Sequence, residues 1–564
     1  MNEVLKVPNP WRKAVGLFTP AKGRSERISF SLGERRQPGA KAKEPTQKGQ
    51  GHRWSKNLDA NADSLKRMFH VPDSSDVVIR ELSCANPRVR ITIAYIEGLS
   101  SSDKVFMAVL QPLMLLSSIS KSDERDPIIQ IKNALLASGQ VEIKETVEES
   151  IEAIVAGDTV VLVEGQDRSL VVETKGWEHR TVQEAVSERI VRGPQQGFVE
   201  VLRINTALLR SMIRTPDLVV EGVEVGRDSK TQCAIVYLES ITNDKLVAEV
   251  RRRLSSIEID AILTSGQVEQ LIETSHSLVP TIISTERPDR AAHFILEGAI
   301  AIMVQGDPFV LLAPVTFFAF IHSPEDYYVR WPYGNVLRLV RVFALFLALL
   351  LPSLYVATTN YHPEMIPTVL LFSVAASREM IPFPLTFEVL FMYIGFELIR
   401  EAGIRIPSPF GSTIGIVGAL LVGEAAVSAS LVSPIMVIVI AITGVASFTI
   451  PNQEVGMLIR IATLIFIVLG SVLGLFGIVV GLYMLSCRLF SLTSLGVPFF
   501  APVVPRKQAS PDTFTVGPAW SMEYRPGFFR PKRQRRQPDI SRQWDIGSME
   551  KEPGPQEGSG GQQQ

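Results

Sequence analysis

The chain contains 564 residues, of which 46% are hydrophobic and 20% are charged, and its formal net charge is −1. This length exceeds that of one compact domain, which usually holds about 100–200 residues, so we expect about three units. The balanced charge gives no sign of a nucleic-acid partner, and three scattered cysteines argue against a disulfide framework. Residues 1–18 lack the apolar core of a secretory signal, so the part of the chain before the first membrane segment is predicted to be cytoplasmic.

Residues 1–62 are rich in Lys, Arg, Gly, Pro and Gln and contain few large apolar side chains. Such a segment cannot bury enough apolar surface to offset the entropy lost on ordering, so we predict a disordered basic extension. Its positive charge would suit anionic lipid head groups, although a solvated tail is the simpler interpretation.

The next part of the chain contains the same α/β unit twice. We predict one subdomain at residues 63–183 and, after a linker helix, a second within residues 184–322. Each copy is expected to run helix, strand, strand, helix, helix, strand, strand, and residues 280–290 would be an extra loop of the second copy. Four blocks recur in the same order, which indicates a duplication. The matched blocks are LKRMFHVPDSSDVVIREL and LLRSMIRTPDLVVEGVEV, ITIAYIEGL and CAIVYLESI, ALLASGQV and AILTSGQV, and IEAIVAGDTVVLVEG and HFILEGAIAIMVQG.

Residues 184–214 are predicted to form a long basic amphipathic helix between the two copies. Arg203, Arg210 and Arg214 would be either a solvated face or a clamp between subdomains. A nucleic-acid stripe is disfavoured, because no aromatic side chains interleave with these arginines as they do in single-strand binders.

Residues 323–505 are predicted to form an all-α polytopic membrane domain, so that the fold class is an α/β soluble region of two duplicated subdomains followed by membrane helices. Aromatic and basic residues at the start of this domain suit the membrane interface. They are Tyr327, Tyr328, Trp331 and Tyr333, with Arg330, Arg338 and Arg341. The predicted spans are 337–357, 366–399 (broken by Pro382 and Pro384), 412–432, 434–450 and 457–489.

Residues 506–564 are predicted to be a disordered tail. Within it, residues 525–536 contain six basic side chains, which favours a cytoplasmic C-terminus and an even number of crossings.

Enzyme signatures are absent from the sequence. There is no phosphate-binding loop, nucleophile elbow or HExxH motif, and the seven histidines are dispersed without metal-ligand spacing. We therefore predict a protein that is not an enzyme, with no catalytic residues, no metal site and no cofactor.

Three glutamates in the apolar spans are the candidate functional residues. An ionisable group at membrane depth costs a few kcal/mol or more, so it normally faces a partner or a water-filled path. Glu388 and Glu397 lie about 180° apart around a straight helix and cannot line one face together. Glu397 is spaced for ion pairing with Arg400, and Glu401 with Arg405, which is the simpler interpretation of these four residues.

Glu424 differs because no basic residue lies within one helical turn of it. It is predicted to face an ion path, a partner in another subunit or a buried neutral hydrogen bond.

Small residues give a second membrane signal. Stripes of glycine allow helices to approach closely, either within one chain or between copies. The predicted packing glycines are Gly411 and Gly415, and a second stripe of Gly470, Gly474, Gly477 and Gly481. Prolines that interrupt the spans fit a channel-like or transporter-like body better than a plain anchor.

Four long motifs carry a family resemblance: RGPQQGFVEVLRINTALLR from Arg192, HPEMIPTVLLFSVAASREMIPFP from His362, ELIREAGIRIPSPFGSTIGIVGALLVGEAAV from Glu397 and SPIMVIVIAITGVASFTIPN from Ser433. The sequence resembles the A-subunit family of bacterial spore nutrient-germinant receptors, the GerA-type spore germination proteins, over roughly residues 64–505. Tyr393 departs from the pattern, since relatives often carry an acidic residue there.

The resemblance implies an integral protein of the spore inner membrane that converts a nutrient signal into ion release and germination. It implies two partners, a transporter-like B subunit and a lipoprotein C subunit, and oligomerisation into a ligand-gated ion channel. The alternatives are a stand-alone secondary transporter of a small solute and a sporulation-specific paralogue that works beside the receptors.

Overall fold

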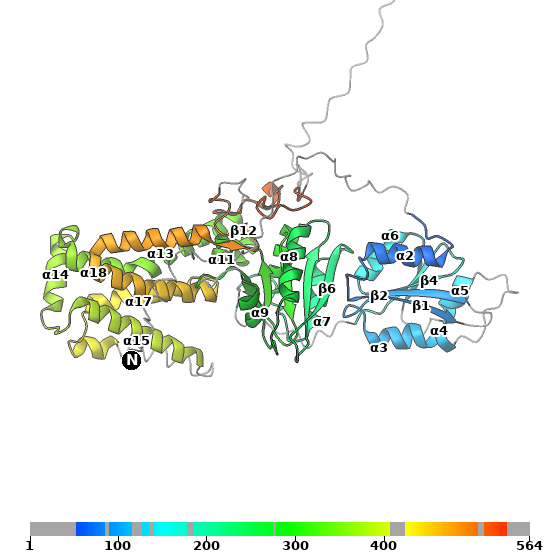
Figure 1. Ribbon diagram of the computed structural model, residues 1–564, viewed down its shortest axis with the longest axis horizontal. Coiled ribbons are helices and arrows are strands. Elements are labelled where there is room, and N and C mark those ends of the chain that lie inside the picture. The colour runs from blue at the N-terminus through cyan, green and yellow to red at the C-terminus, as the bar shows by residue number, and fades with distance from the viewer. Residues whose placement is uncertain are drawn as a thin grey trace, which may run out of the picture.

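The computed structural model contains two α/β units followed by a helical body, arranged in a row along the long axis of the molecule (Figure 1). It describes residues 52–84, 89–115, 127–134, 140–176, 185, 188, 190–273, 278–405, 423–505 and 512–537.

The first unit is a five-stranded antiparallel sheet with the order β1-β2-β4-β5-β3. Its elements are α2 (Leu58–Met68), β1 (Val77–Cys84), β2 (Val89–Ile96), α3 (Ser102–Lys104), a π-helical turn η1 (Val105–Leu110), α4 (Gln111–Leu115), α5 (Pro127–Ala134), β3 (Val141–Lys144), α6 (Val147–Val155), β4 (Thr159–Val163) and β5 (Ser169–Val172). Side chains alternate across the sheet. Ala94 and Ile96 pack under α2 and α6, whereas Ile91 and Ile93 pack against α4 and α5 (Figure 1).

The second unit repeats this topology with the order β6-β7-β9-β10-β8. Its elements are α7 (Leu202–Met212), β6 (Leu218–Val225), β7 (Thr231–Leu238), α8 (Asp244–Ser255), α9 (Ser265–Ile272), β8 (Ile283–Thr285), α10 (Pro288–Glu297), β9 (Ile300–Val304) and β10 (Val310–Ala313). Helices α7 and α10 cover one face and α8 and α9 the other. The identical strand order confirms the predicted duplication.

Each unit contains one more strand than predicted, β3 or β8, and both are short edge strands. Residues 280–290 are not an extra loop, because they form β8 and the start of α10 and so match β3 and α6 of the first unit. The ALLASGQV match does not hold at its last residue. Val141 begins β3, whereas Val268, its counterpart in the block, lies within α9. An eight-residue block is too short to distinguish a helix from a strand end.

The boundary predicted for the N-terminal extension is wrong for residues 52–62. Asn57 caps α2 by accepting hydrogen bonds from the backbone N–H groups of Asp59 and Ala60. Trp54 is buried, and its Nε1 donates to Ser150 Oγ over 3.0 Å. The prediction missed the buried Trp54 because the residues before it, which lie outside the described part, are mostly polar.

The predicted long linker helix is also wrong, because helix α7 begins only at Leu202 and residues 190–201 are not helical. Pro194 lacks a backbone N–H, and Gly193 adopts a φ of +133°, which interrupt a helix. The Phe198 N–H instead donates to the Glu286 carbonyl over 2.7 Å.

Helix α7 clamps the two α/β units together. Arg210 is fully buried and donates from Nε and Nη2 to the two carboxylate oxygens of Asp76, over 2.7 and 2.8 Å. Arg203 forms an ion pair of 3.2 Å with Glu97 that is partly exposed, and Arg214 is exposed. Of the two predicted roles for these arginines, the clamp therefore holds for Arg210.

The helical body consists of α11 (Phe317–Ile321), α12 (Glu325–Tyr328), α13 (Trp331–Tyr361), a 3-10 turn η2 (Pro363–Met365), α14 (Thr368–Arg378), α15 (Leu385–Arg405), α17 (Pro434–Phe448) and α18 (Gln453–Ser491). The predicted span 366–399 is divided into α14 and α15 at its prolines, and most of span 412–432 lies outside the described residues. Helices α13 and α18 are long and apolar enough to cross a membrane.

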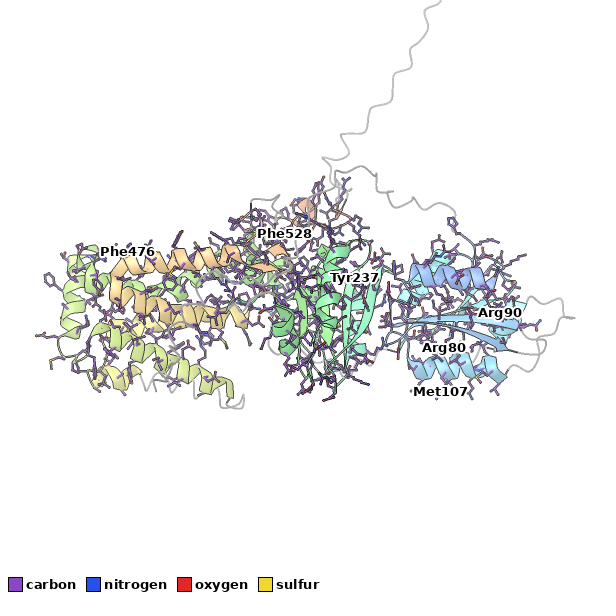
Figure 2. All side chains as sticks on the ribbon, in the orientation of Figure 1. Arg80, Arg90, Met107, Tyr237, Phe476 and Phe528 are labelled. Carbon is purple, nitrogen blue, oxygen red and sulfur yellow. The ribbon has the colours of Figure 1, made fainter. Side chains whose placement is uncertain are left out.

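Large apolar side chains cover the outer surface of the body. One of them, Phe476, is 68% exposed (Figure 2).

Helix α18 is a hairpin of two antiparallel arms, 453–473 and 475–491. Gly474 has φ +62° and ψ −144°, which no helix contains. In a straight helix residues 466 and 481 would be about 22 Å apart. A Cβ on Gly481 would nevertheless lie 3.0 Å from the Phe466 ring.

After α18 the chain returns to the second α/β unit through β11 (Thr493–Ser494) and β12 (Val497–Pro498), and later contains the 3-10 turn η3 (Ala519–Ser521). The predicted disordered tail is therefore wrong for residues 512–537, which we call the C-terminal segment. Phe528 and Phe529 are buried in the core of the second unit (Figure 2). Lys532 Nζ donates to Glu239 Oε1 over 2.7 Å. The chain thus enters and leaves the helical body at the same end.

Candidate functional site

Glu388 on α15 is fully buried at the start of α17. Its Oε1 accepts a hydrogen bond of 2.6 Å from the Ser433 N–H, and Ser433 is the N-cap of α17. The positive end of a helix dipole favours a carboxylate at this position. Oε2 lies 3.7 Å from Arg378 Nε at the end of α14. Glu388 therefore ties three helices together through a carboxylate that is itself fully buried, with a partly exposed arginine beside it.

Glu397, on the same helix, belongs to a separate polar cluster. Its two oxygens each lie 3.4 Å from a guanidinium nitrogen, one from Arg400 and one from Arg460 on α18. The Arg400 guanidinium also stacks over the rings of Phe396 and Phe448, 5.0 and 4.5 Å from their centres. The predicted local ion pair is present, and a second pair to another helix is added to it.

The predicted pair between Glu401 and Arg405 lies outside the described side chains, because that of Arg405 is not described. Tyr393, the departure from the family pattern, is buried, and its hydroxyl donates to the Arg460 carbonyl over 3.1 Å. It holds the first arm of α18 beside α15.

Glu424 is exposed on the surface of the helical body. Neither a hydrogen bond nor an ion pair joins it to any residue that the structure describes. Its neighbour Gly423 is buried, and a Cβ there would lie 3.6 Å from Val437 of α17. The helical stretch 423–428 thus turns its small residue towards α17 and its carboxylate away from the described part of the helical body.

The second glycine group packs helices, although not as one stripe. Gly470 lies against α13, where a Cβ would come within 2.9 Å of the Ser353 carbonyl oxygen. On the other arm of the hairpin, a Cβ on Gly477 would come within 2.3 Å of the Leu469 carbonyl oxygen. The turn at Gly474 places these glycines inside a hairpin, where a straight helix would align them on one face. Gly411 and Gly415 lie outside the described residues.

Comparison with known proteins gives the family of the chain. The sequence family described as Bacillus/Clostridium GerA spore germination protein matches residues 63–528. The chain belongs to the GerA family. Spore germination protein KA of Bacillus subtilis (strain 168) is 40% identical over 475 residues, which cover 84% of this chain and 86% of that protein. Spore germination protein GerLA of Bacillus cereus is 38% identical over 432 residues, covering 76% and 87%.

Among solved structures, the crystal structure of the N-terminal domain of the A subunit of the Bacillus megaterium spore germinant receptor GerK3 is similar to this GerA-family chain. It is 34% identical and covers 48% of this chain and 99% of that chain, with a TM-score of 0.38.

A cavity of about 1000 Å³, with several charged residues in its wall, lies between the second α/β unit of this GerA-family protein and its helical body. Arg400 and Arg460 of the Glu397 cluster line the cavity from the helical body, and Glu269 and Glu273 line it from the second α/β unit. Burial, together with the carboxylates of Glu454 and Glu273, raises the pKa of Glu269 to about 8. The cavity therefore links the soluble region to the ion pairs of Glu397 through charged walls. We call it the junction cavity.

The segment leading into the helical body differs from the prediction. Arg338 is 2% exposed and lies between Asp326 and Asp512, 3.3 and 3.1 Å away. Arg341 also pairs with Asp326, over 2.7 Å. Both arginines are therefore ion-pair partners within the protein and not a basic flank for lipid head groups, and Arg338 attaches the C-terminal segment through Asp512. The sequence gives no sign that Arg338 pairs with Asp512, because the two residues lie 174 positions apart.

Three partners of the predicted glutamates were missed: Arg378, Arg460 and Ser433. An arginine within an apolar span was the available signal for Arg378 and Arg460. Ser433 donates through its backbone, which no side-chain pattern reveals. The role of the three glutamates in ion movement remains a prediction.

Proposed function

We propose that this chain is the A subunit of a germinant receptor in the spore inner membrane. It couples nutrient sensing to ion release, and copies of its helical body together enclose the ion path. It is not an enzyme, and it works with a transporter-like B subunit and a lipoprotein C subunit. Membership of the GerA family supports the receptor role.

The observation that carries the ion-path proposal is the exposed carboxylate of Glu424. Large apolar side chains surround the body on which it lies, and a charge facing lipid costs several kcal/mol. A second subunit or a column of water removes this cost. We propose that copies of the chain supply this environment, with Glu424 facing the space between them.

The junction cavity supports the same proposal from the soluble side. Its charged walls reach Arg400 and Arg460, which hold Glu397 inside the helical body. Ions that leave the membrane path would enter water at this point. The chain enters and leaves the helical body at one end, which supports placing the α/β units and the C-terminal segment on the same side of the membrane, and we propose that this is the cytoplasmic side.

The test is ion conductance of the purified chain in liposomes. We expect Glu424→Gln to lower conductance by roughly tenfold, which corresponds to a barrier increase of about 1.4 kcal/mol. Glu379→Gln is the matched control, since Glu379 is also exposed but lies at the C-cap of α14. Its conductance should stay within about twofold of wild type. Oligomeric state and thermal stability are measured for both variants.

Unchanged conductance in a folded, oligomeric Glu424→Gln variant would overturn the ion-path assignment. Saturable uptake of a solute by the purified chain without other subunits would instead support a secondary transporter. Spores without the gene, tested across amino acids, sugars and nucleosides, would then identify the nutrient signal.

A further inference from the structure

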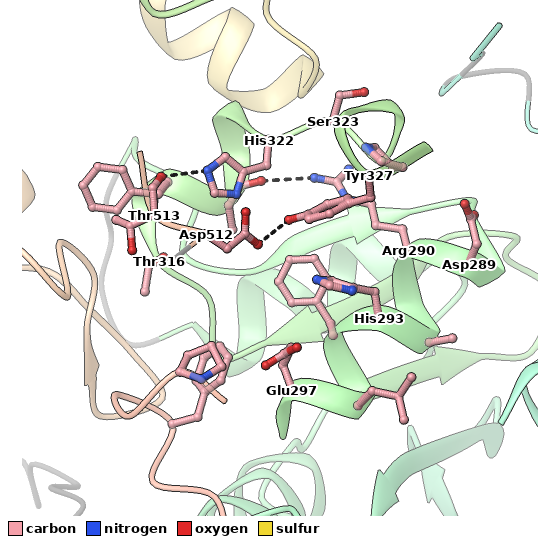
Figure 3. Close-up of a pocket in the computed structure, with 18 of the residues that line it drawn as sticks. Asp289, Arg290, His293, Glu297, Thr316, His322, Ser323, Tyr327, Asp512 and Thr513 are labelled. Atoms are coloured by element: carbon pink, nitrogen blue, oxygen red, sulfur yellow. Dashed lines mark hydrogen bonds between the residues drawn. The ribbon is translucent and has the colours of Figure 1, made fainter. Parts of the chain in front are cut away.

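A second cavity, of about 340 Å³, lies between α10, the α11–α12 region and the C-terminal segment (Figure 3). Its volume is within the range of small-molecule sites. It is distinct from the glutamates of the helical body, and only Arg290, Ser323 and Pro324 also line the junction cavity. We call it the α10 pocket.

Most of the wall of the α10 pocket is apolar. Phe294 and Phe318 come from the second unit and the α11 helix, and Phe528 and Phe529 come from the C-terminal segment. The last two rings pack edge to face, with centres 4.6 Å apart. Such walls suit the flat or branched hydrocarbon part of a small organic molecule.

Polar side chains lie among these rings. Glu297 and His293 lie one helical turn apart on α10. The His293 ring packs against Tyr327, with centres 4.8 Å apart, and Glu297 lies across the pocket from Tyr327 and Asp512 (Figure 3). Tyr327 donates its hydroxyl to Asp512 Oδ2 over 2.5 Å. Burial lowers the pKa of His293 to about 4, so its imidazole is neutral at pH 7.

Glu297 has one unsatisfied oxygen. The residue is 6% exposed, and its Oε1 lies 2.6 Å from Arg536 Nη1. Its Oε2 is buried and has no hydrogen-bond partner among the described residues. A buried acceptor without a donor costs about 1–3 kcal/mol, and more when it is charged.

The charges of the pocket favour a cationic occupant. The unsatisfied side-chain oxygens in its described wall, Glu297 Oε2 and Asp289 Oδ1, both belong to carboxylates. Both arginines of the wall are already engaged, Arg290 with Glu188 over 2.8 Å and Arg536 with Glu297. An anion would find no free guanidinium there, whereas an ammonium group would find a free carboxylate oxygen.

We propose that the α10 pocket binds a small organic amine whose ammonium group donates to Glu297 Oε2 and whose apolar part lies among the phenylalanine rings. This inference goes beyond the proposed function, because it concerns a ligand site within the A subunit itself. The ligand contacts both α10 and the C-terminal segment. That segment also reaches the helical body, through Asp512 with Arg338 and through Asn335, whose Nδ2 donates to the Val516 carbonyl over 3.2 Å. Occupancy therefore strengthens the attachment of the helical body to the second unit.

The test uses the full-length chain in lipid nanodiscs and isothermal titration calorimetry with three probes of similar shape: benzylamine, benzyl alcohol and benzoate. We expect benzylamine to bind at least about tenfold more tightly than benzyl alcohol, and benzoate to bind more weakly than both. This tenfold corresponds to one charge-assisted hydrogen bond. Failure of benzylamine to bind, or equal affinity for the amine and the alcohol, would overturn the proposal.

Glu297→Gln should abolish the preference for the amine and leave the weak binding of benzyl alcohol. Glu258→Gln, a change at an exposed residue outside the pocket, should keep the preference. If Glu297→Gln does not fold, Phe294→Leu provides the second variant, because it should weaken the amine and the alcohol alike. An unchanged affinity of both probes for folded Phe294→Leu would overturn the assignment. These binding readouts do not depend on ion conductance, so the proposed function and this inference can fail separately.

Discussion

The clamp between the two α/β units depends on one buried ion pair, Asp76 with Arg210. Both side chains are 1% exposed, and the two hydrogen bonds are 2.7 and 2.8 Å long. Replacement of one partner leaves the other charge buried and uncompensated. Asp76→Asn and Arg210→Met should therefore each destabilise the contact between the units by about 3–5 kcal/mol.

Hydrogen–deuterium exchange with mass spectrometry measures this effect on the full-length chain. The relevant peptides cover residues 70–84 and 202–212, on the two sides of the contact. At about 1.4 kcal/mol per tenfold, exchange there should accelerate by about 140- to 3,700-fold, up to the rate at which the whole unit opens. Peptides of the helical body should exchange at unchanged rates.

A matched control exists in the same interface. Arg203 and Glu97 form an ion pair of 3.2 Å in which both side chains are 43% exposed. Glu97→Gln should change the opening free energy by less than about 1 kcal/mol, since exposed ion pairs contribute little. The double variant Asp76→Leu/Arg210→Met should recover much of the lost protection, because apolar groups can replace a buried ion pair without a large penalty.

Exchange that stays within about fivefold of wild type in both single variants would refute the assignment of a buried clamp. The reasoning would also fail if the double variant exchanged faster than either single variant. In that case the packing of these side chains, and not the removal of their charges, would dominate the free energy.

Two further predictions concern the helical body and the junction cavity. Gly477→Ala should destabilise the chain by about 1–3 kcal/mol in thermal unfolding, because the new Cβ would meet the Leu469 carbonyl oxygen at 2.3 Å. Gly456→Ala, where a Cβ meets open space, is the control and should be tolerated. Glu269→Gln should raise the melting temperature at pH 8.5 but hardly at pH 5. The pKa of Glu269 is about 8 in the folded chain and 4.5 in the unfolded chain. The folded state is therefore fully stable below pH 4.5 and loses free energy of unfolding as the pH rises from 4.5 to 8, because the unfolded chain ionises first. Equal gains at both pH values would contradict this.

The duplication could be predicted because it is a local pattern repeated in order. Tyr95 and Tyr237, aligned in the sequence, are both the penultimate residue of the second strand in their unit. The fifth strands escaped prediction because β3 and β8 are three or four residues long at sheet edges, where no apolar alternation develops.

The ordered parts of both terminal segments were missed because composition averages over a whole segment. Trp54 and Phe528 anchor stretches that are otherwise polar and rich in Gly and Pro. One or two buried aromatic side chains, together with backbone hydrogen bonds to a preformed unit, are sufficient to order such a stretch. Their partners lie about a hundred residues or more away, so no window along the sequence contains both.

The sequence by itself determined the kind of protein: the repeated α/β pattern, the apolar spans and the costly glutamates within them all follow from periodicity and transfer free energy, which are local properties. Only the tertiary structure decided which charges meet. Ion pairs form between Asp76 and Arg210, between Glu397 and Arg460, and between Arg338 and Asp512. Each pair joins two elements that come close only when the whole chain has packed. Gly474 is a further example. The sequence shows that a glycine is present, but only the structure shows that the second arm of α18 turns there and returns along the first.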